Sequence, residues 1–426
     1  MKRTILLLPA LFLLVTAACV NDDATLDELI RNNKPDSTIV PVDTVQPIDI
    51  QLDYSDLEEP DDVVPTDEAD PAYNDYHENT DWNWTVTITY DGDTARLSGN
   101  TSRVRYTVKG ADVTINSTSS RMQYVATGQS DDGSLKIYSE NKFKLTLDGL
   151  NLTNTEGAAI NNQCGKTCYL VLADDTENNL ADGPAYTYVT GEDQKGAFFS
   201  EGQVIVSGRG TLNITANGGH GMACDDYFRF RPGCKINITA NAGHAIKSND
   251  GVWMDGGVLN LLASANGTRG IKCDASVYIA GGRLTAITAG DSRIEPATEL
   301  AQADTTSAAG IKADTAVVIT GGTVMLLSTG EGAKGINAGQ NIDITAGTVK
   351  VVTTGAKVNS APKAIKCDGV INITGGYVYA YSANSKPIDA DIALNVAEGY
   401  TTYETLEKRV IIQFPTSDVS AKPRRP

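Results

Sequence analysis

The chain has 426 residues, of which 41% are apolar, and its formal net charge at pH 7 is −18. The charge is uneven, because residues 20–81 hold 19 acidic and two basic residues, whereas residues 82–426 hold 34 acidic and 31 basic residues. A body this close to neutral lacks the basic excess of nucleic-acid-binding proteins, so we expect no nucleic-acid partner. The 40 glycines and the 6% aromatic content favour an all-β architecture with many turns.

Residues 1–18 have the pattern of an export signal, with Lys2 and Arg3 before an apolar run and small residues leading to Cys19. The apolar run is too short for a durable membrane span. Small residues directly before a cysteine resemble the signal of bacterial lipoproteins, in which that cysteine is lipidated, for example with palmitate. The two aspartates after Cys19 resemble the signal for the outer cell surface. We therefore expect an outer-membrane lipoprotein exposed on the cell surface, with plain secretion as the alternative.

Residues 19–81 are rich in Asp, Glu and Pro and have no sustained hydrophobic period. Such a composition does not bury enough apolar surface to offset the entropy of ordering the chain. We therefore expect a disordered acidic tether, which charge repulsion extends away from the lipid surface.

Strand-like alternation begins near Trp82, and residues 82–133 do not carry the repeat of the later chain. The open end of a solenoid pairs with other strands unless it is covered. We therefore assign residues 82–133 to an N-terminal β cap.

A five-residue pattern, Gly-Ile-Lys-Cys-Asp at residues 270–274, recurs through the rest of the chain. Related stretches begin at residues 221, 245, 310, 335, 364 and 387, with steps of 24, 25, 40, 25, 29 and 23 residues between their apolar second positions. Each copy leads into a second apolar run, a glycine pair and a third apolar run. Three short strands per repeat predict a right-handed parallel β-helix over residues 134–395, with coils of about 22–25 residues.

Alternation along a strand turns this pattern into two columns of side chains on the surface. If Ile271 and Cys273 point into the core, then Lys272 and Asp274 point outward. Because coils stack about 4.8 Å apart, we expect one column of Lys247, Lys272, Lys312 and Lys366, interrupted at Asn337. A second column beside it holds Asp225, Asn249, Asp274, Asp314 and Asp368. The columns form either a solvated ladder of ion pairs or a strip that binds anions, with lysines for carboxylates and aspartates for a bridging cation.

Two insertions, at residues 174–195 and 291–308, interrupt the repeat and should project as loops, which in solenoids often lie beside the binding face. The 40-residue step contains the second of them. Residues 396–426 leave the pattern, and we expect residues 410–414 to close the C-terminal end.

The cysteines and histidines of the body indicate neither a disulfide framework nor a multi-histidine metal site. Cys224, Cys273 and Cys367 fall on the inward column of non-adjacent coils, too far apart to pair, so we expect buried thiols. Cys164 and Cys168 are spaced to close a small loop, but they lack the partner pair of a zinc site. The histidines at 220 and 244 are one repeat apart and should stack.

Residues 142–154, 165–174, 195–202 and 224–230 together resemble bacterial carbohydrate-binding domain-containing proteins, and the similarity extends over about residues 82–390. The resemblance implies a right-handed β-helix similar to that of pectate lyases, bound calcium, and binding of plant-wall polysaccharides such as polygalacturonate. It does not place the calcium ligands, so our metal candidates, chosen for their chemistry, are Asp225, Asp274, Asp314 and Asp368. Our carbohydrate-binding candidates are Lys247, Lys272, Lys312, Lys366 and Asn249.

These observations favour a monomeric, non-catalytic protein that binds acidic, pectin-like polysaccharide with the help of calcium, which prefers oxygen ligands. A lyase is an alternative, because one of Lys247, Lys272 and Lys312 becomes a base if burial lowers its pKa. A hydrolase is less favoured, because Gly-His-Gly and Asp-Asp occur within one coil, at residues 219–226, rather than on neighbouring coils. A structural or adhesive surface protein is the third possibility.

Overall fold

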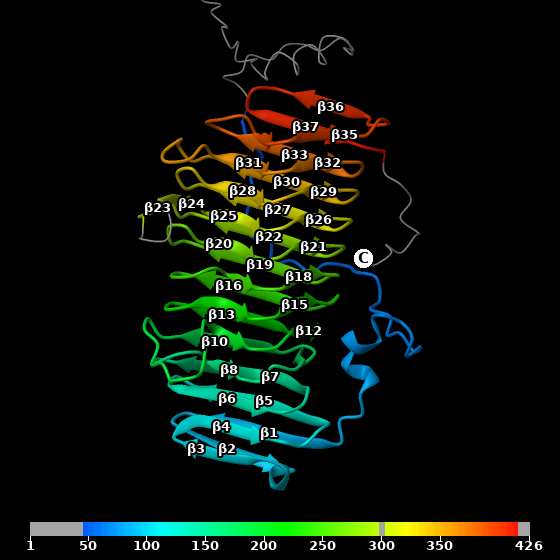
Figure 1. Cartoon of the computed structure of the whole chain (residues 1–426). Coiled ribbons are helices and arrows are strands. Elements are labelled where there is room, and N and C mark those ends of the chain that lie inside the picture. The colour runs from blue at the N-terminus through cyan, green and yellow to red at the C-terminus, as the bar shows by residue number, and fades with distance from the viewer. Residues whose placement is uncertain (1–45, 298–302, 416–426) are drawn as a thin grey trace, which may run out of the picture. The chain divides into compact units, whose positions relative to one another are not determined.

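The structure is a computed structural model that describes residues 46–297 and 303–415 (Figure 1). The fold below is that of the described part of residues 46–426, which we call the second unit because residues 1–45 form a separate one. The expected export signal and Cys19 lie outside the described residues. No helix in the described part of the chain has the length and apolar content needed to span a bilayer.

The second unit is a parallel β-solenoid of about 11 turns with 2% helix, which confirms the predicted fold class. One coil contains three strands, as in β14 (His220–Cys224), β15 (Tyr227–Phe230) and β16 (Lys235–Ala240). Equivalent strands of successive coils pair in parallel and form three rows, which we call row 1, row 2 and row 3.

Row 1 is the parallel part of a 12-stranded sheet. Besides β14, its strands are β4 (Ala111–Ser117), β6 (Gly133–Ser139), β8 (Ile160–Asn162), β11 (Gly196–Ser200), β17 (Ile246–Ser248), β20 (Arg269–Cys273), β25 (Ala309–Ala313), β28 (Lys334–Ala338), β31 (Lys363–Cys367) and β34 (Ile388–Ala390).

Rows 2 and 3 belong to one 23-stranded sheet, and the long β7 (Phe143–Asn154) contributes to both. Besides β15, row 2 contains β1 (Trp84–Asp91), β5 (Met122–Ser130), β9 (Cys168–Leu172), β12 (Val204–Gly208), β18 (Gly251–Met254), β21 (Val277–Ile279), β26 (Val317–Ile319), β29 (Ile342–Ile344), β32 (Val370–Ile373) and β35 (Ala393–Val396). Besides β16, row 3 contains β10 (Glu177–Asp182), β13 (Thr211–Ala216), β19 (Val258–Ala263), β22 (Arg283–Thr288), β27 (Thr323–Ser328), β30 (Thr348–Thr353) and β33 (Tyr377–Ser382).

The core is a narrow column of inward side chains from all three rows, including the fully buried Ile246, Ile311 and Cys273. Glycine pairs make the turn between rows 2 and 3. The second glycine of each pair, as at Gly282 and Gly322, has a positive φ, a conformation that glycine adopts without steric cost. The six cysteines between 164 and 367 are buried and free, so the expected thiols of the inward column are present and Cys164 and Cys168 are not bonded to each other.

Antiparallel strands lie at both ends of the coils. At one end β2 (Thr94–Gly99) pairs with β1 and β3 (Arg105–Lys109) pairs with β4, while η4 (Thr101–Arg103) joins them. Within the predicted cap, β1, β4 and β5 already continue the parallel rows. At the other end β37 (Arg409–Gln413) pairs with β33 and with β36 (Thr402–Thr405).

The insertions differ from each other. The first begins with β10, which belongs to row 3, and only its later part is a loop. The second forms a two-stranded antiparallel pair of β23 (Arg293–Glu295) and β24 (Asp304–Thr306) at the side of the coils.

The prediction of a disordered tether is wrong for residues 46–81, which we call the strap. The strap contains η2 (Tyr73–Asp75) and η3 (His77–Asn79) and runs along rows 2 and 3 as the blue segment of Figure 1. Its contacts extend from Ile48, whose N–H donates to Tyr379 at 3.3 Å, to Asn74, whose carbonyl accepts from Tyr169 at 2.6 Å. The physical reason is charge matching, because strap carboxylates pair with arginines of the coils.

Candidate functional site

The predicted lysine column lies on row 1. Lys247 pairs in register with Lys272, and Lys272 with Lys312, which confirms that the three lysines are neighbours on successive coils. Asn337 takes the next position and Lys366 follows it. Their side chains are partly exposed while the flanking residues of each strand are buried, as strand alternation requires.

The acidic column lies directly beside it, one residue beyond the row 1 strands. The backbone N–H of each member donates to a carbonyl of the preceding coil at 2.9–3.3 Å, so the column is continuous. Its members in coil order are Glu201, Asp225, Asn249, Asp274, Asp314, Gly339, Asp368 and Asp391. We call the two columns together the Lys–Asp ladder. Sequence reasoning missed Glu201, because its stretch has Phe199 at the position where the motif has lysine.

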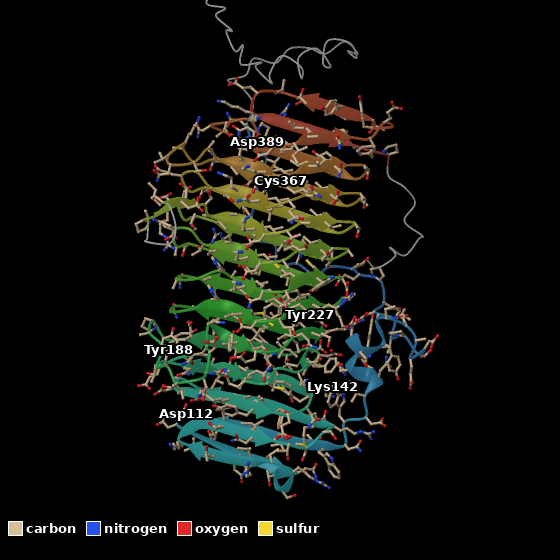
Figure 2. All side chains as sticks on the ribbon, in the orientation of Figure 1. Asp112, Lys142, Tyr188, Tyr227, Cys367 and Asp389 are labelled. Atoms are coloured by element: carbon tan, nitrogen blue, oxygen red, sulfur yellow. The ribbon has the colours of Figure 1, made fainter. Side chains whose placement is uncertain are left out.

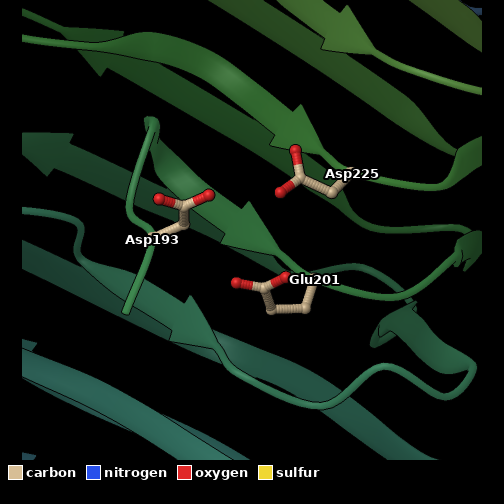
Figure 3. A group of neighbouring side chains, drawn as sticks. All are labelled: Asp193, Glu201 and Asp225. Atoms are coloured by element: carbon tan, nitrogen blue, oxygen red, sulfur yellow. The ribbon is translucent and has the colours of Figure 1, made fainter. Parts of the chain in front are cut away.

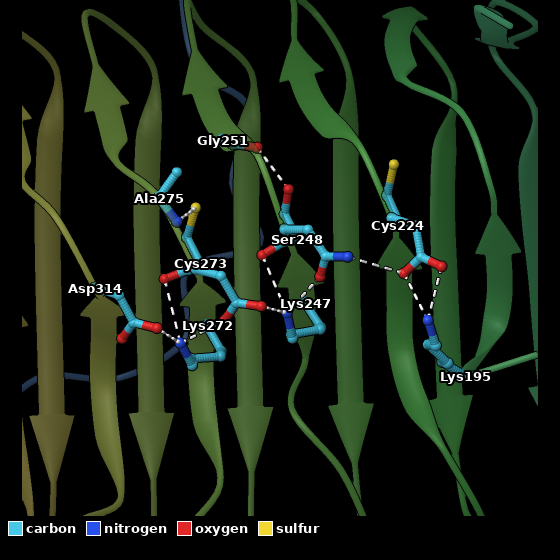
Figure 4. A network of polar contacts seen from close by, with 12 residues as sticks. Lys195, Cys224, Lys247, Ser248, Gly251, Lys272, Cys273, Ala275 and Asp314 are labelled. Atoms are coloured by element: carbon cyan, nitrogen blue, oxygen red, sulfur yellow. Dashed lines mark hydrogen bonds and ion pairs between the residues drawn. The ribbon is translucent and has the colours of Figure 1, made fainter. Parts of the chain in front are cut away.

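Ladder lysines bridge their own coil and the next one (Figure 4). Lys272 Nζ lies 2.6 Å from an Asp274 oxygen and 2.6 Å from an Asp314 oxygen. Lys366 Nζ is likewise 3.0 Å from both Asp368 and Asp391. Burial alone acts to raise the pKa of Asp274, but hydrogen bonds from Lys247 and Lys272 outweigh it and lower that pKa. Most of the ladder is therefore internally neutralised.

The ladder has one break. Lys312 Nζ lies 3.4 Å from Asp314 of its own coil, but the next coil places Gly339 where the other bridges have a carboxylate. A Cβ at Gly339 would lie 2.2 Å from the backbone oxygen of Asp314, so the coil stacking itself requires glycine there. Among the described residues, Asp314 is the only carboxylate paired with Lys312.

A group of three carboxylates lies at the start of the acidic column (Figure 3). Oxygens of Asp193, Glu201 and Asp225 lie within 4.8 Å of one another. Lys195 Nζ is 2.7 Å from both Asp225 oxygens and 2.8 Å from Asp193. Burial and the neighbouring Asp225 and Asp193 raise the pKa of Glu201, which indicates a local excess of negative charge.

The metal candidates thus differ in what surrounds them. Asp225 has two further carboxylates beside it and offers the oxygen-rich surroundings that calcium prefers. Asp274, Asp314 and Asp368 are each paired with a ladder lysine instead. Sequence reasoning missed Asp193 and Lys195, because they belong to the first insertion and reach the ladder only through the fold.

The paired histidines stack as expected, with ring centroids 4.7 Å apart. Burial, followed by the charges of Lys247 and Lys195, lowers the pKa of His220 to about 4, and burial lowers the pKa of His244 well below its ordinary value. Nδ1 of His220 accepts from the His244 backbone N–H at 2.9 Å. These neutral rings hold neighbouring turns together.

A lysine that acts as a catalytic base needs a lowered pKa, and a lysine outside the ladder, Lys334, has one. Burial lowers the pKa of Lys334 to about 8. This side chain is 4% exposed, and its Nζ donates to Gly332 O at 2.9 Å and Ala361 O at 2.6 Å. An ammonium group enclosed in this way secures the loop after row 3 rather than facing a polymer outside.

The chain is similar to a curated protein, to a solved structure and to a protein family. A curated carbohydrate-binding domain-containing protein of Acetivibrio thermocellus is 28% identical over 114 residues, which make up 26% of this chain and 40% of that relative. A solved polysaccharide lyase-like protein from C. thermocellum covers 74% of this chain and 98% of its own, with 21% identity and a TM-score of 0.39. The family described as carbohydrate-binding domain-containing protein matches residues 109–276 and 264–355. Because these two matches span more than half of the chain, the protein belongs to that family.

Proposed function

We propose that the protein binds an acidic, pectin-like polysaccharide such as polygalacturonate along the Lys–Asp ladder, without cleaving it. The observation that supports this best is the break beside Lys312. Lys272 and Lys366 each have a carboxylate on their own coil and another on the next, whereas Lys312 has only the first among the described residues. A uronate carboxylate takes the position that Gly339 leaves without an acid. Family membership supports a carbohydrate as the ligand.

Calcium is part of this proposal. The residues that fit it best are Asp193, Glu201 and Asp225, since three carboxylates supply oxygen ligands and a cation relieves the charge that raises the pKa of Glu201. Lys195 now neutralises two of these groups and competes with a cation for them. A sugar carboxylate supplies further oxygen ligands when bound.

We also propose that the protein acts as a monomer at the cell surface, held in the outer membrane by lipid on Cys19. The sequence pattern of residues 1–19 supports the lipid anchor. A pectin lyase or hydrolase, and a structural or adhesive surface protein, are the competing functions. Release of unsaturated or reducing-end sugars from polygalacturonate would identify an enzyme, and absence of any polysaccharide binding would favour the structural protein.

The test compares two lysines of equal charge by affinity electrophoresis in gels that contain polygalacturonate. Lys312→Ala should weaken binding about fivefold, since a contact at the surface contributes about 1 kcal/mol or less. Lys366→Ala removes the same charge from a lysine with two carboxylate partners, and it should weaken binding less. A calcium chelator should lower the affinity of the wild type. Equal effects of the two substitutions, or binding that ignores chelator and salt, would show that the ladder is only an ion-paired surface.

A further inference from the structure

A second polar surface lies on row 3, away from the Lys–Asp ladder. Five outward asparagines stack on successive strands of this row, from β7 to β19. Each amide donates to the carbonyl oxygen of the preceding one, including the bonds from Asn237 to Asn213 at 2.8 Å and from Asn260 to Asn237 at 3.0 Å. We call this set the asparagine column: Asn151, Asn179, Asn213, Asn237 and Asn260.

The strap covers one end of this column. The Asn260 amide donates to the backbone oxygen of Asp53 at 2.9 Å and accepts from the Asp53 N–H at 3.2 Å. Arg283 donates to the backbone oxygens of Asp53 and Ser55. The backbone on both sides of Tyr54 is therefore fixed, while the Tyr54 side chain remains 62% exposed.

Tyr54 and three members of the asparagine column, Asn213, Asn237 and Asn260, line a cavity of about 330 Å³. This volume is at the lower end of the range of roughly 300–1,000 Å³ for small-molecule sites. A second cavity of about 130 Å³ continues along the same row and shares Asn213 with the first. We call the two cavities together the groove, since their lining residues follow one another across the strands of row 3. A linear chain of several sugar units requires such an arrangement.

The groove has hydrogen-bonding capacity to spare at its centre. An amide group offers two N–H donors and two acceptor lone pairs. Asn237 uses one donor on Asn213 and one lone pair on Asn260 within the described part of the chain, so one of each is left. A sugar hydroxyl both donates and accepts, and it matches that remaining pair.

Among the charged lining residues of the groove, the lysine is already paired, whereas Glu177 and Asp131 are acidic. Lys235 forms an ion pair with Asp56 of the strap. Glu177 accepts a hydrogen bond from Asn213 at 2.8 Å. This set of groups contrasts with the Lys312 break, where a cation has one carboxylate partner among the described residues. The groove therefore disfavours an acidic ligand and suits a neutral one.

We propose that this groove binds a neutral glycan chain, with the Tyr54 ring against a sugar face and Asn237 bonded to a hydroxyl. A tyrosine ring supplies a rigid, amphipathic contact surface at low cost in conformational entropy. The site is separate from the ladder, so it requires carbohydrate binding by this family but not the acidic ligand proposed above. The strap is a wall of the site.

Affinity electrophoresis of the full chain tests the proposal, with gels that contain glucomannan, xylan or galactan as neutral polymers and polygalacturonate as the acidic one. At least one neutral polymer should retard the wild type. Tyr54→Ala should weaken that retardation about tenfold, as loss of an aromatic anchor does, whereas Tyr54→Phe keeps the ring and should retain it. Tyr54→Ala should leave retardation by polygalacturonate unchanged.

Tyr188 provides a matched control, because it is 71% exposed and lies in Figure 2 on the side of the coils opposite the strap. Tyr188→Ala should bind neutral polymer as the wild type does. Retardation by none of the neutral polymers, full retardation of Tyr54→Ala, or an equal loss in Tyr188→Ala would overturn the proposal. A loss of polygalacturonate binding in Tyr54→Ala would overturn its neutral specificity. If Lys312→Ala binds polygalacturonate as the wild type does while the neutral-polymer results hold, only the proposal of an acidic ligand on the ladder is overturned.

Discussion

The strap and the Lys–Asp ladder are both rows of ion pairs, but they differ in the burial of their cations. Arg231 is 4% exposed in its side chain and bonds to both Asp62 and Glu78 of the strap. Lysines of the ladder are 14–24% exposed, and the acceptor Asp274 is 43% exposed. Water therefore screens the ladder pairs more than the pairs of Arg231, whereas Arg229, at 12% exposed, is nearly as accessible as Lys272 at 14%.

Because of this difference, the ion pairs of the strap and those of the ladder have different roles. The strap pairs hold a segment far away in sequence against the coils, and a planar guanidinium that binds two carboxylates defines its position. The ladder pairs connect coils that backbone hydrogen bonds already hold together. Ladder side chains are therefore free to exchange their partners for those of a ligand.

The largest effect is expected from Arg231→Met, which leaves Asp62 and Glu78 without their cation. Breaking a buried ion pair costs about 3–5 kcal/mol, and because Glu78 is partly exposed we expect about 2–3 kcal/mol here. The strap should then be cleaved by a protease between residues 46 and 81, while the coils remain folded. Urea denaturation and mass spectrometry of the proteolytic fragments measure the two effects.

Lys386→Met is the control for this prediction, because Lys386 pairs with Asp389 at 2.9 Å on the surface. Its loss should cost a few tenths of a kcal/mol and leave the strap protected. If both variants lose equal stability, burial does not distinguish the two regions.

Acid should release the strap before it unfolds the coils. Hydrogen bonds from Arg231 lower the pKa of Glu78, although burial opposes them. A carboxyl with a lowered pKa stabilises the docked state above its ordinary pKa of about 4, and this stability is lost as pH falls through the lower value. Burial lowers the pKa of His77, so its protonation below pH 6.5 also opposes docking.

Hydrogen exchange as a function of pH measures this release. Amides of residues 46–81 should lose protection as the pH falls below about 4, while row 1 amides remain protected because their core neighbours are apolar and the partly exposed ladder pairs contribute little to stability. Simultaneous loss in both regions would mean that the strap and the coils unfold as one unit.

The repeat made the coils and the ladder predictable, because a period near 24 residues places equivalent side chains on top of one another. The register of Lys247 and Lys272 followed from that period, and the register of Lys272 and Lys312 followed from the recurrence of the motif across the 40-residue step. The strap could not be predicted in this way, since its acidic composition indicates disorder unless the arginines that it meets are known. The asparagines at 213, 237 and 260 do carry the period in the sequence, at steps of 24 and 23 residues, and this signal could have indicated the column.

Asp193 and Lys195 were missed for a different reason from Glu201, which lies in register with the repeat. Asp193 belongs to an insertion, which has no register with the repeat, and Lys195 is the last residue before β11. Their approach to Asp225 depends on how the loop folds back from β10, and no periodic pattern records that. Tyr54 is a similar case, because the strap positions it through contacts with Asn260 and Arg283.

Apart from the Lys386→Met control, the smallest effect is expected from Lys272→Met, although Lys272 has two carboxylate partners at 2.6 Å. The substitution keeps most of the aliphatic stem, and both aspartates are exposed enough for water to replace the ammonium group. The cost in stability should therefore be about 1 kcal/mol or less, measured by urea denaturation beside Arg231→Met. Asp274 retains its contact with Lys247 at 2.5 Å, which limits the rise of its pKa. A loss as large as that of Arg231→Met would mean that the ladder holds the coils together, and that its lysines are not free to bind a polysaccharide.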